Sequence, residues 1–145
     1  MKIKTKFYGE IEVSENELIM FKKPLLGFEK EQRFALIPAL DEVSPFLMLQ
    51  STEDINLAFY LISPWMVDED YEFNLTNEQV ELLGVEQPED LNVLTLITIS
   101  SDIEKMTTNL LAPIVVNMKN QQAMQIVLQQ TDYTTKHPIL KAEAA

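Results

Sequence analysis

Hydrophobic and polar residues alternate at the start of the chain in the pattern of half-buried β-strands. Lys2–Phe7 alternates lysines with Ile, Thr and Phe, and Glu10–Val13 alternates glutamates with Ile and Val. Successive side chains of a strand point to opposite faces of a sheet, so this period of two indicates one buried and one wet face. Tyr8-Gly9 stands between the two runs and predicts a tight turn or a bulge.

Further short apolar runs continue the β pattern along most of the chain. The longest, Leu91–Ile99, has apolar side chains on both faces and is expected to be central or well covered. Ile114–Met118 and Met124–Leu128 bracket the polar stretch Lys119–Gln122, which predicts a hairpin. The other predicted strands are Leu18–Phe21, Phe34–Ile37, Phe46–Gln50 and Leu57–Ile62.

One short helix has both a start and a stop signal. Thr76 and Gln79 have the spacing of a capping box, in which each side chain bonds the other's backbone. Gly84 can end the helix in the left-handed conformation. A single helical turn is predicted at Ser63-Pro64, because proline suits the first helical position, and this turn carries Trp65.

These elements predict a mainly β fold: a small antiparallel β-barrel or a strongly bent sheet with one or two short helices. The 145 residues fit one domain, and no repeat or linker divides them. We therefore assign residues 1–140 to a single β domain. Residues 141–145 have nothing to bury and are expected to be a disordered tail or a cloning remnant.

The composition is that expected of a cytoplasmic protein. Cysteine is absent, which excludes disulfides and thiolate chemistry and suits a reducing compartment. The N-terminus is basic and alternating, without the apolar core of a signal peptide. No stretch approaches the roughly 18 apolar residues of a membrane helix, so no membrane contact is expected.

The charge is distributed very unevenly along the chain. The net charge is −12, and from Phe34 through Glu104 there are fifteen Asp and Glu residues and no Lys or Arg. Unless the flanks fold over it, such a stretch repels phosphate backbones and attracts a basic protein. We expect no direct nucleic-acid binding and a protein partner; acidic surface that serves only solubility would give the same counts.

The sequence contains no complete motif for catalysis, metal binding or cofactor binding. The single histidine, His137, has no cysteine or second histidine to pair with, and none of the three glycines belongs to a phosphate-binding loop. A calcium loop counted from Asp68 would need glycine at its sixth position and glutamate at its twelfth, where Phe73 and Gln79 stand. We expect no metal, no cofactor and no enzyme activity; a small barrel enzyme that uses carboxylates is the alternative.

Three segments, Leu25–Glu29, Pro45–Ser51 and Thr108–Asn117, occur in an order and spacing that cover the chain from about Lys2 to Leu140. Together they resemble the flagellar assembly factor FliW family. One departure is Met48, where a bulkier aromatic is expected in many relatives.

The resemblance implies a small β-barrel with short helices and two protein partners in the cytoplasm. Family members look like chaperones of newly made flagellin that, when free, bind and antagonise CsrA, an RNA-binding repressor of flagellin translation. A flagellin chaperone without the CsrA role is the alternative. The acidic stretch suits a basic repressor, and we hypothesise that inhibition is partly electrostatic and weakens as salt rises.

The candidate site residues follow from charge and from expected exposure. The densest acid cluster, Asp68, Glu69, Asp70 and Glu72, is the predicted repressor-binding patch, with a solvated loop as its alternative. Flagellin is expected to bind apolar surface at Phe28 and Trp65; Phe46 is a weaker candidate, for which a core position is favoured. In the third segment, Asn109 and Asn117 are motif residues that can also hold turns through side-chain to backbone bonds.

Overall fold

The computed structural model of the chain describes residues 1–23, 25, 27–28, 33–38 and 46–139. Helix α1 is Asn77–Leu83, and four 3-10 turns are η1 (Glu15–Glu17), η2 (Pro64–Met66), η3 (Pro88–Asp90) and η4 (Ile103–Lys105). The strands of the described residues are β1 (Lys2–Thr5), β2 (Gly9–Glu12), β3 (Leu18–Phe21), β4 (Arg33–Pro38), β5 (Leu47–Ser51), β6 (Ala58–Ile62), β7 (Leu91–Thr98), β8 (Thr107–Thr108), β9 (Ile114–Asn117), β10 (Gln122–Gln125) and β11 (His137–Pro138).

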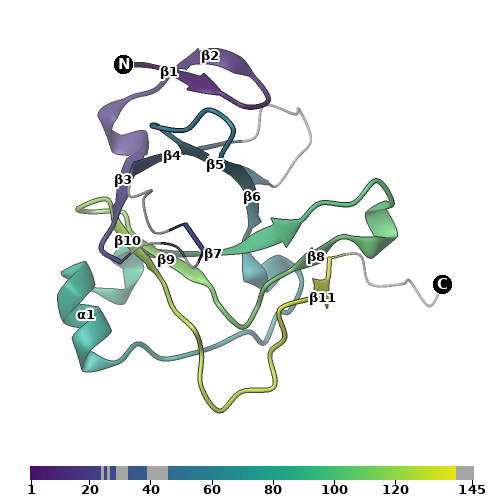
Figure 1. Ribbon diagram of the computed structural model, residues 1–145. Coiled ribbons are helices and arrows are strands. Elements are labelled where there is room, and N and C mark those ends of the chain that lie inside the picture. The colour runs from purple at the N-terminus through teal and green to yellow at the C-terminus, as the bar shows by residue number, and fades with distance from the viewer. Residues whose placement is uncertain (24, 26, 29–32, 39–45, 140–145) are drawn as a thin grey trace.

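Seven strands close into a barrel, which Figure 1 shows nearly end-on. The order β3-β4-β5-β6-β7-β9-β10 returns from β10 to β3. Each neighbouring pair is antiparallel except β10 and β3, which run parallel and pair Gln122 with Met20 and Ala123 with Phe21. Strand direction cannot alternate all the way round a closed ring with an odd number of strands. The predicted barrel is therefore confirmed, with one parallel seam in an otherwise antiparallel sheet.

The inward side chains of the barrel strands form its hydrophobic interior. They include Phe21 from β3, Phe34 from β4, Leu49 from β5, Leu61 from β6 and Ile114 from β9, each at most 1% exposed. The rings of Phe21 and Phe34 meet edge-on, with their centroids 5.4 Å apart. Alternate residues of the same strands point outward, so parts of the outer surface need their own cover.

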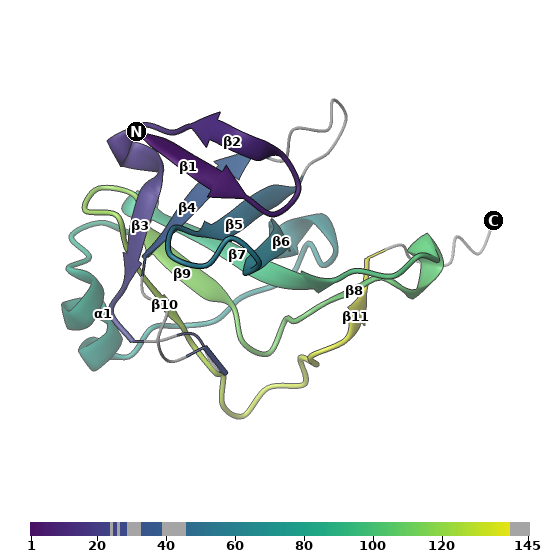
Figure 2. The same ribbon diagram turned by 45° about the horizontal axis from the view of Figure 1, so that its top comes forward.

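The N-terminal hairpin covers one part of the outer surface, as Figure 2 shows. Strands β1 and β2 pair in the predicted way, and Gly9, at φ +69°, begins β2. The buried residues Ile3 and Val13 pack on Ala35, Ile37 and Met48 of β4 and β5. Met48, the departure from the family pattern, is wholly buried in this second cluster.

The chain from η2 through α1 covers the outer faces of β7, β9 and β10. Buried Val67, Tyr71 and Leu83 of this segment pack against residues that include Val115 and Met124. The helix has the predicted capping box, in which Gln79 N donates to Thr76 Oγ1 over 3.1 Å, and it ends at Gly84 with φ +65°. The predicted turn at Ser63-Pro64 is also present as η2.

The predicted strands agree with the structure except near the C-terminal hairpin. The second strand of that hairpin was expected at Met124–Leu128, but β10 is Gln122–Gln125. The turn closes earlier because Asn117 Oδ1 accepts Lys119 N and Gln121 adopts φ +62°. The two-residue strands β8 and β11 carry no sequence pattern and were not expected. The predicted tail at residues 141–145 lies outside the described residues.

Candidate functional site

Trp65 and the acidic run come together at one place on the surface. The indole Nε1 of Trp65 donates to the carbonyl oxygen of Tyr71 over 2.7 Å, and the two rings meet edge-on at 5.8 Å. Trp65 stays 42% exposed, and the adjacent Met66 is 60% exposed. A half-buried indole N–H needs an acceptor, and this hydrogen bond holds the exposed ring beside the chain that carries Asp68 and Glu72.

Tyr71 anchors the acidic run to the barrel. Its side chain is 2% exposed and its hydroxyl donates to Leu110 O over 2.8 Å. Burial raises the pKa of Tyr71, and the nearby Tyr133 and Asp68 raise it further, so the phenol stays protonated at neutral pH. Tyr133 lies 4.5 Å from the Tyr71 ring, and its hydroxyl accepts Glu72 N over 2.9 Å.

The carboxylates around this anchor face solvent. Glu69, Asp70 and Glu72 are exposed, and Asp68 is half-buried, with its Oδ1 accepting Asp70 N over 3.0 Å. Within the described part of the chain no lysine, arginine or histidine forms a salt bridge with any of the four. The predicted repressor patch and the predicted flagellin contact Trp65 therefore form one continuous surface, which we call the acidic–aromatic surface: Trp65, Met66, Asp68, Glu69, Asp70 and Glu72.

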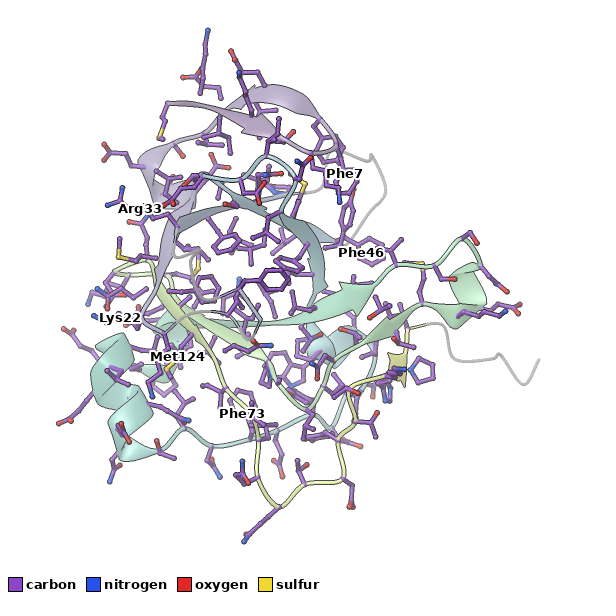
Figure 3. The ribbon with its side chains drawn as sticks, viewed as in Figure 1. Phe7, Lys22, Arg33, Phe46, Phe73 and Met124 are labelled. Carbon is purple, nitrogen blue, oxygen red and sulfur yellow. The ribbon has the colours of Figure 1, made fainter. Side chains whose placement is uncertain are left out.

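Phe28 and Phe46, the other predicted apolar contacts, lie elsewhere. Phe28 is 37% exposed and meets the ring of Phe59 edge-on at 5.2 Å, and Phe59 packs against the barrel interior. Phe46 is half-buried, and its ring centroid lies 6.5 Å from that of Tyr60. Figure 3 shows Phe46 near Phe7 and far from Phe73. Phe28 and Phe46 therefore contact Phe59 and Tyr60 of β6, whereas Trp65 contacts Tyr71.

Asn109 and Asn117 bond the backbone of the turns beside them. Asn109 Oδ1 accepts the amides of Leu111 and Ala112 over 3.1 and 3.0 Å. Asn117 is 1% exposed, and its Nδ2 donates to Leu83 O over 2.8 Å at the end of α1. Both side chains hold local structure, and Asn117 also joins β9 to the helix.

The flanking lysines barely neutralise the acidic middle of the chain. Across the described residues, one ion pair links a flank to the Phe34–Glu104 stretch, between Lys119 Nζ and Glu86 Oε2 at 3.1 Å. Both of its side chains are well exposed, so its contribution to stability is small. The remaining acids of the described stretch form no salt bridge with a lysine or arginine of the described flanks.

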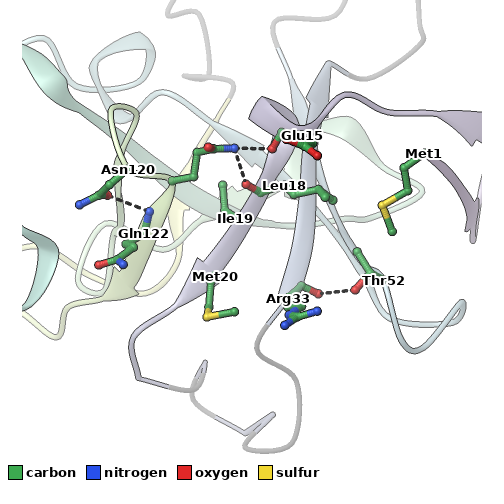
Figure 4. A pocket seen from close by; sticks show the side chains of 10 residues that line it. Met1, Glu15, Leu18, Ile19, Met20, Arg33, Thr52, Asn120 and Gln122 are labelled. Atoms are coloured by element: carbon green, nitrogen blue, oxygen red, sulfur yellow. Dashed lines mark hydrogen bonds between the residues drawn. The ribbon is translucent and has the colours of Figure 1, made fainter.

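Two grooves flank the β3–β10 seam and the acidic run. The first, about 510 Å³, lies between β3, β4 and the β9–β10 turn and includes Met20, Arg33 and Gln121. The Gln121 amide donates to the backbone oxygens of Glu15 and Leu18 there. Figure 4 shows Thr52 bonded to Arg33 in the same groove. The second, about 380 Å³, starts at Glu72 and runs along residues 126–131. The part of the chain that the structure describes contains no cluster of three or more His, Cys, Asp or Glu able to hold a metal ion.

The residues that support the acidic–aromatic surface were not predicted from the sequence. Tyr71 and Tyr133 stand behind the carboxylates, and Met66 adds to the exposed apolar area beside Trp65. The Trp65–Tyr71 pair is local, and an acceptor for the indole could have been sought within a few residues. No sequence pattern could have indicated the bond between Glu72 and Tyr133, which are 61 positions apart.

The closed ring of seven strands defines the chain as a small β-barrel protein. Its sequence matches the model of a family described as "FliW protein" over residues 2–139. The chain belongs to the FliW family.

Similar proteins extend over nearly the whole chain. The "Flagellar assembly factor FliW" of Bacillus subtilis (strain 168) is 45% identical over 139 residues, covering 96% of each chain. A protein of the same name from Clostridium botulinum (strain Langeland) is 39% identical over 144 residues, covering 99% of this chain and all of the relative. A crystal structure of the flagellar assembly factor FliW superposes with a TM-score of 0.90 at 32% identity and covers 99% of both chains.

These relatives are named for assembly and not for a catalysed reaction, and on that ground the chain is not an enzyme. Among the described residues, no helix has the length and apolar character needed to cross a bilayer.

Proposed function

We propose that this protein acts in flagellar assembly as a cytoplasmic regulator with two protein partners. It binds flagellin as a chaperone and, when free of flagellin, binds a CsrA-type RNA-binding repressor and relieves repression of flagellin synthesis. The names of the relatives support the flagellar part of this proposal. The observation that carries the repressor part is the acidic–aromatic surface, whose four carboxylates form no salt bridge within the described chain.

The repressor is expected to meet the carboxylates of this surface. A protein that grips mRNA needs a basic face, and a negative surface steers such a partner into contact. Once the complex has formed, the same carboxylates repel RNA phosphates over about one Debye length, roughly 8 Å at physiological salt. Part of the inhibition then does not require this protein to cover the RNA-binding site of the repressor.

Flagellin is expected to meet the apolar part of the same surface. Trp65 and Met66 are exposed side by side on η2, at 42% and 60%. Amphipathic terminal helices of an unassembled partner would cover such a patch, because burying a large aromatic side chain contributes about 1.5–3 kcal/mol. Since the apolar and acidic parts adjoin, bound flagellin would hinder access of the repressor.

The repressor part is tested by removing the four charges. The variant D68N/E69Q/D70N/E72Q should slow association with the purified repressor on the order of ten-fold at low salt, because electrostatic steering is lost. The matched control E78Q/E81Q/E89Q/E104Q removes the same charge from exposed positions elsewhere. Association rates are measured by stopped flow. If they fall equally in both variants, the effect comes from net charge and not from these four positions. If they change in neither variant, the four carboxylates are not part of the repressor-binding site.

The alternative, a flagellin chaperone without the repressor role, makes a different prediction. In that case the pure protein does not release a flagellin mRNA leader from the repressor at any salt concentration. The proposal requires release, and release should weaken between about 50 and 500 mM NaCl as the field is screened. A filter-binding assay with labelled RNA distinguishes the two functions.

A further inference from the structure

One edge of β10 continues past its partner strand β3. Along the seam, Met20 N donates to Gln121 O over 3.0 Å, and Lys22 N donates to Ala123 O over 2.8 Å. The backbone groups of the odd-numbered residues therefore face β3, which ends at Phe21. Because backbone groups alternate between the two edges of an extended strand, those of Val127 belong to this same edge.

The opposite edge of the segment is already occupied. Ile126 N donates to Pro113 O and Leu128 N donates to Leu111 O, each over 2.9 Å. These bonds keep residues 126–128 extended and direct the amides of the even-numbered residues toward 111–113. The amides of Val127 and Gln129 have no backbone partner among the described residues. Val127 and Gln129 are both exposed residues, Val127 at 45%.

A groove of about 380 Å³ runs along this segment. One bank is residues 126–131, and the other is the extended chain from Glu72 to Thr76 with Gln79 of α1. Glu72 stands at the groove as part of the acidic run, and no lysine or arginine belongs to its lining. The groove is therefore electronegative, with both apolar and amide surface available along its length.

We infer that this groove binds an extended peptide of a partner protein, one that carries Lys or Arg and adds as a strand to the edge at Val127 and Gln129. Free N–H groups on alternate residues match an extended backbone, whereas a helix satisfies its own backbone groups. The exposed Val127 offers apolar contact to an alternate side chain of the peptide. Glu72 and the carboxylates next to it select a cationic residue by charge.

The short length of the edge limits what can bind. Gln130 adopts φ +53°, which turns the chain away after Gln129. A bound strand therefore forms hydrogen bonds over only a few residues, and much of its selectivity must come from side chains. The inference does not depend on flagellin or the repressor being partners, because it rests on backbone geometry and on the groove.

The experiment uses the full chain and four seven-residue probes. The first is a blocked peptide alternating Lys and Val, the second has its alternate backbone nitrogens methylated, the third has Glu for Lys, and the fourth is a helix-forming peptide of the same charge. NMR titration up to about 1 mM, the weak end of measurable affinity, follows the amides of Val127 and Gln129. We expect the first peptide alone to bind, to shift both amides and to protect them from hydrogen exchange.

Two variants of the protein test the same hydrogen bonds by changing the edge in place of the peptide. V127P removes one edge N–H, and V127T is its matched control with the N–H and the β-branch kept. V127P should weaken binding of the first peptide at least ten-fold and V127T less than two-fold, with E72Q intermediate. If V127P does not fold, the methylated peptide still tests strand pairing, because it lacks the N–H groups that would donate to the carbonyl oxygens of the same edge.

Several results would contradict binding of an extended cationic peptide at this edge. No binding by the first peptide, equal binding by the methylated or helical peptide, or binding by the Glu peptide would each overturn the inference. So would sedimentation showing that a second copy of this chain pairs along Val127–Gln129 in place of the peptide.

Discussion

At the scale of single residues, buried polar side chains connect parts of the chain that are far apart in sequence. Asn117 joins β9 to the end of α1, and Gln50 Oε1 accepts Lys6 N over 2.9 Å, which ties the hairpin to β5. Thr108 Oγ1 donates to Thr95 Oγ1 over 2.7 Å between β8 and β7. A buried polar group that loses its partner costs stability, so these side chains are sensitive positions.

Replacing Asn117 by alanine should lower the free energy of unfolding by about 2–3 kcal/mol, because it removes a buried donor to Leu83 O and Gly84 O and leaves Lys119 N without its partner. The control is N120A, at an exposed residue that also donates to Leu83 O, over 2.9 Å. Its cost should stay below about 1 kcal/mol, since water can replace the lost bond. Urea denaturation measures both, and equal losses would contradict the special role of Asn117.

Tyr71 should make the fold sensitive to alkaline pH. Burial, together with Tyr133 and Asp68, raises its pKa above the unfolded value of about 10. The folded state then holds a proton that the unfolded chain releases, so this stability is complete below about pH 10 and is lost as pH rises above it.

The Y71F variant isolates that titration. At pH 7 it should be about 1 kcal/mol less stable than the parent, having lost the bond to Leu110 O. Between about pH 10 and 11.5 this difference should shrink, because only the parent must keep a phenol protonated. F73L, which changes a ring neighbour without a titrating group, should show a difference that does not vary with pH. A Y71F difference that widens with pH would contradict the assignment.

At the scale of elements, local signals explain what could be predicted from sequence. The helix was predicted from Thr76, Gln79 and Gly84 because a cap depends on residues within one or two turns. The strands were predicted from alternation, which also needs no distant partner. The β10–β3 pairing and the two-residue strands β8 and β11 were not predicted, because only tertiary contacts define them. Candidate residues were found by type, but their grouping around Tyr71 and Tyr133 required the fold.

Gly84, at the end of α1, and Gly9, at the start of β2, make a matched pair of positions for glycine substitution. Gly84 and Gly9 have similar φ angles of +65° and +69°, so alanine should cost about 1–2 kcal/mol of backbone strain at each. At Gly84 an added Cβ would also lie 2.9 Å from Asn120 Nδ2, while nothing lies within 4 Å at Gly9. G84A should therefore exceed G9A by about 1 kcal/mol, because Asn120 must give up its bond to Leu83 O. Thermal unfolding compares them, and a larger loss for G9A would contradict this account.

At the scale of the whole molecule, charge is the dominant feature. The net charge is −12, and the described acidic stretch receives a single ion pair from the flanks, from Lys119. Like charges repel more strongly in the compact state than in an expanded chain. The surface that suits a basic partner therefore reduces the stability of the free protein.

This repulsion predicts stabilisation by salt. Raising NaCl from about 10 to 150 mM shortens the Debye length from roughly 30 to 8 Å and should raise the Tm by a few degrees. D68N/E69Q/D70N/E72Q should show a smaller increase, because it starts with less repulsion. Scanning calorimetry at fixed pH makes the comparison, and a Tm that falls over this range would show that attractive pairs dominate instead.

The parallel seam between β3 and β10 determines when the barrel can close during synthesis of the chain. The ring of strands joins Met20 and Phe21 to Gln122 and Ala123, so it cannot close while the ribosome still holds the later residues. Tyr133, which supports Tyr71 and Glu72, emerges later still. Each molecule therefore acquires its closed core and its acidic–aromatic surface only near the end of translation.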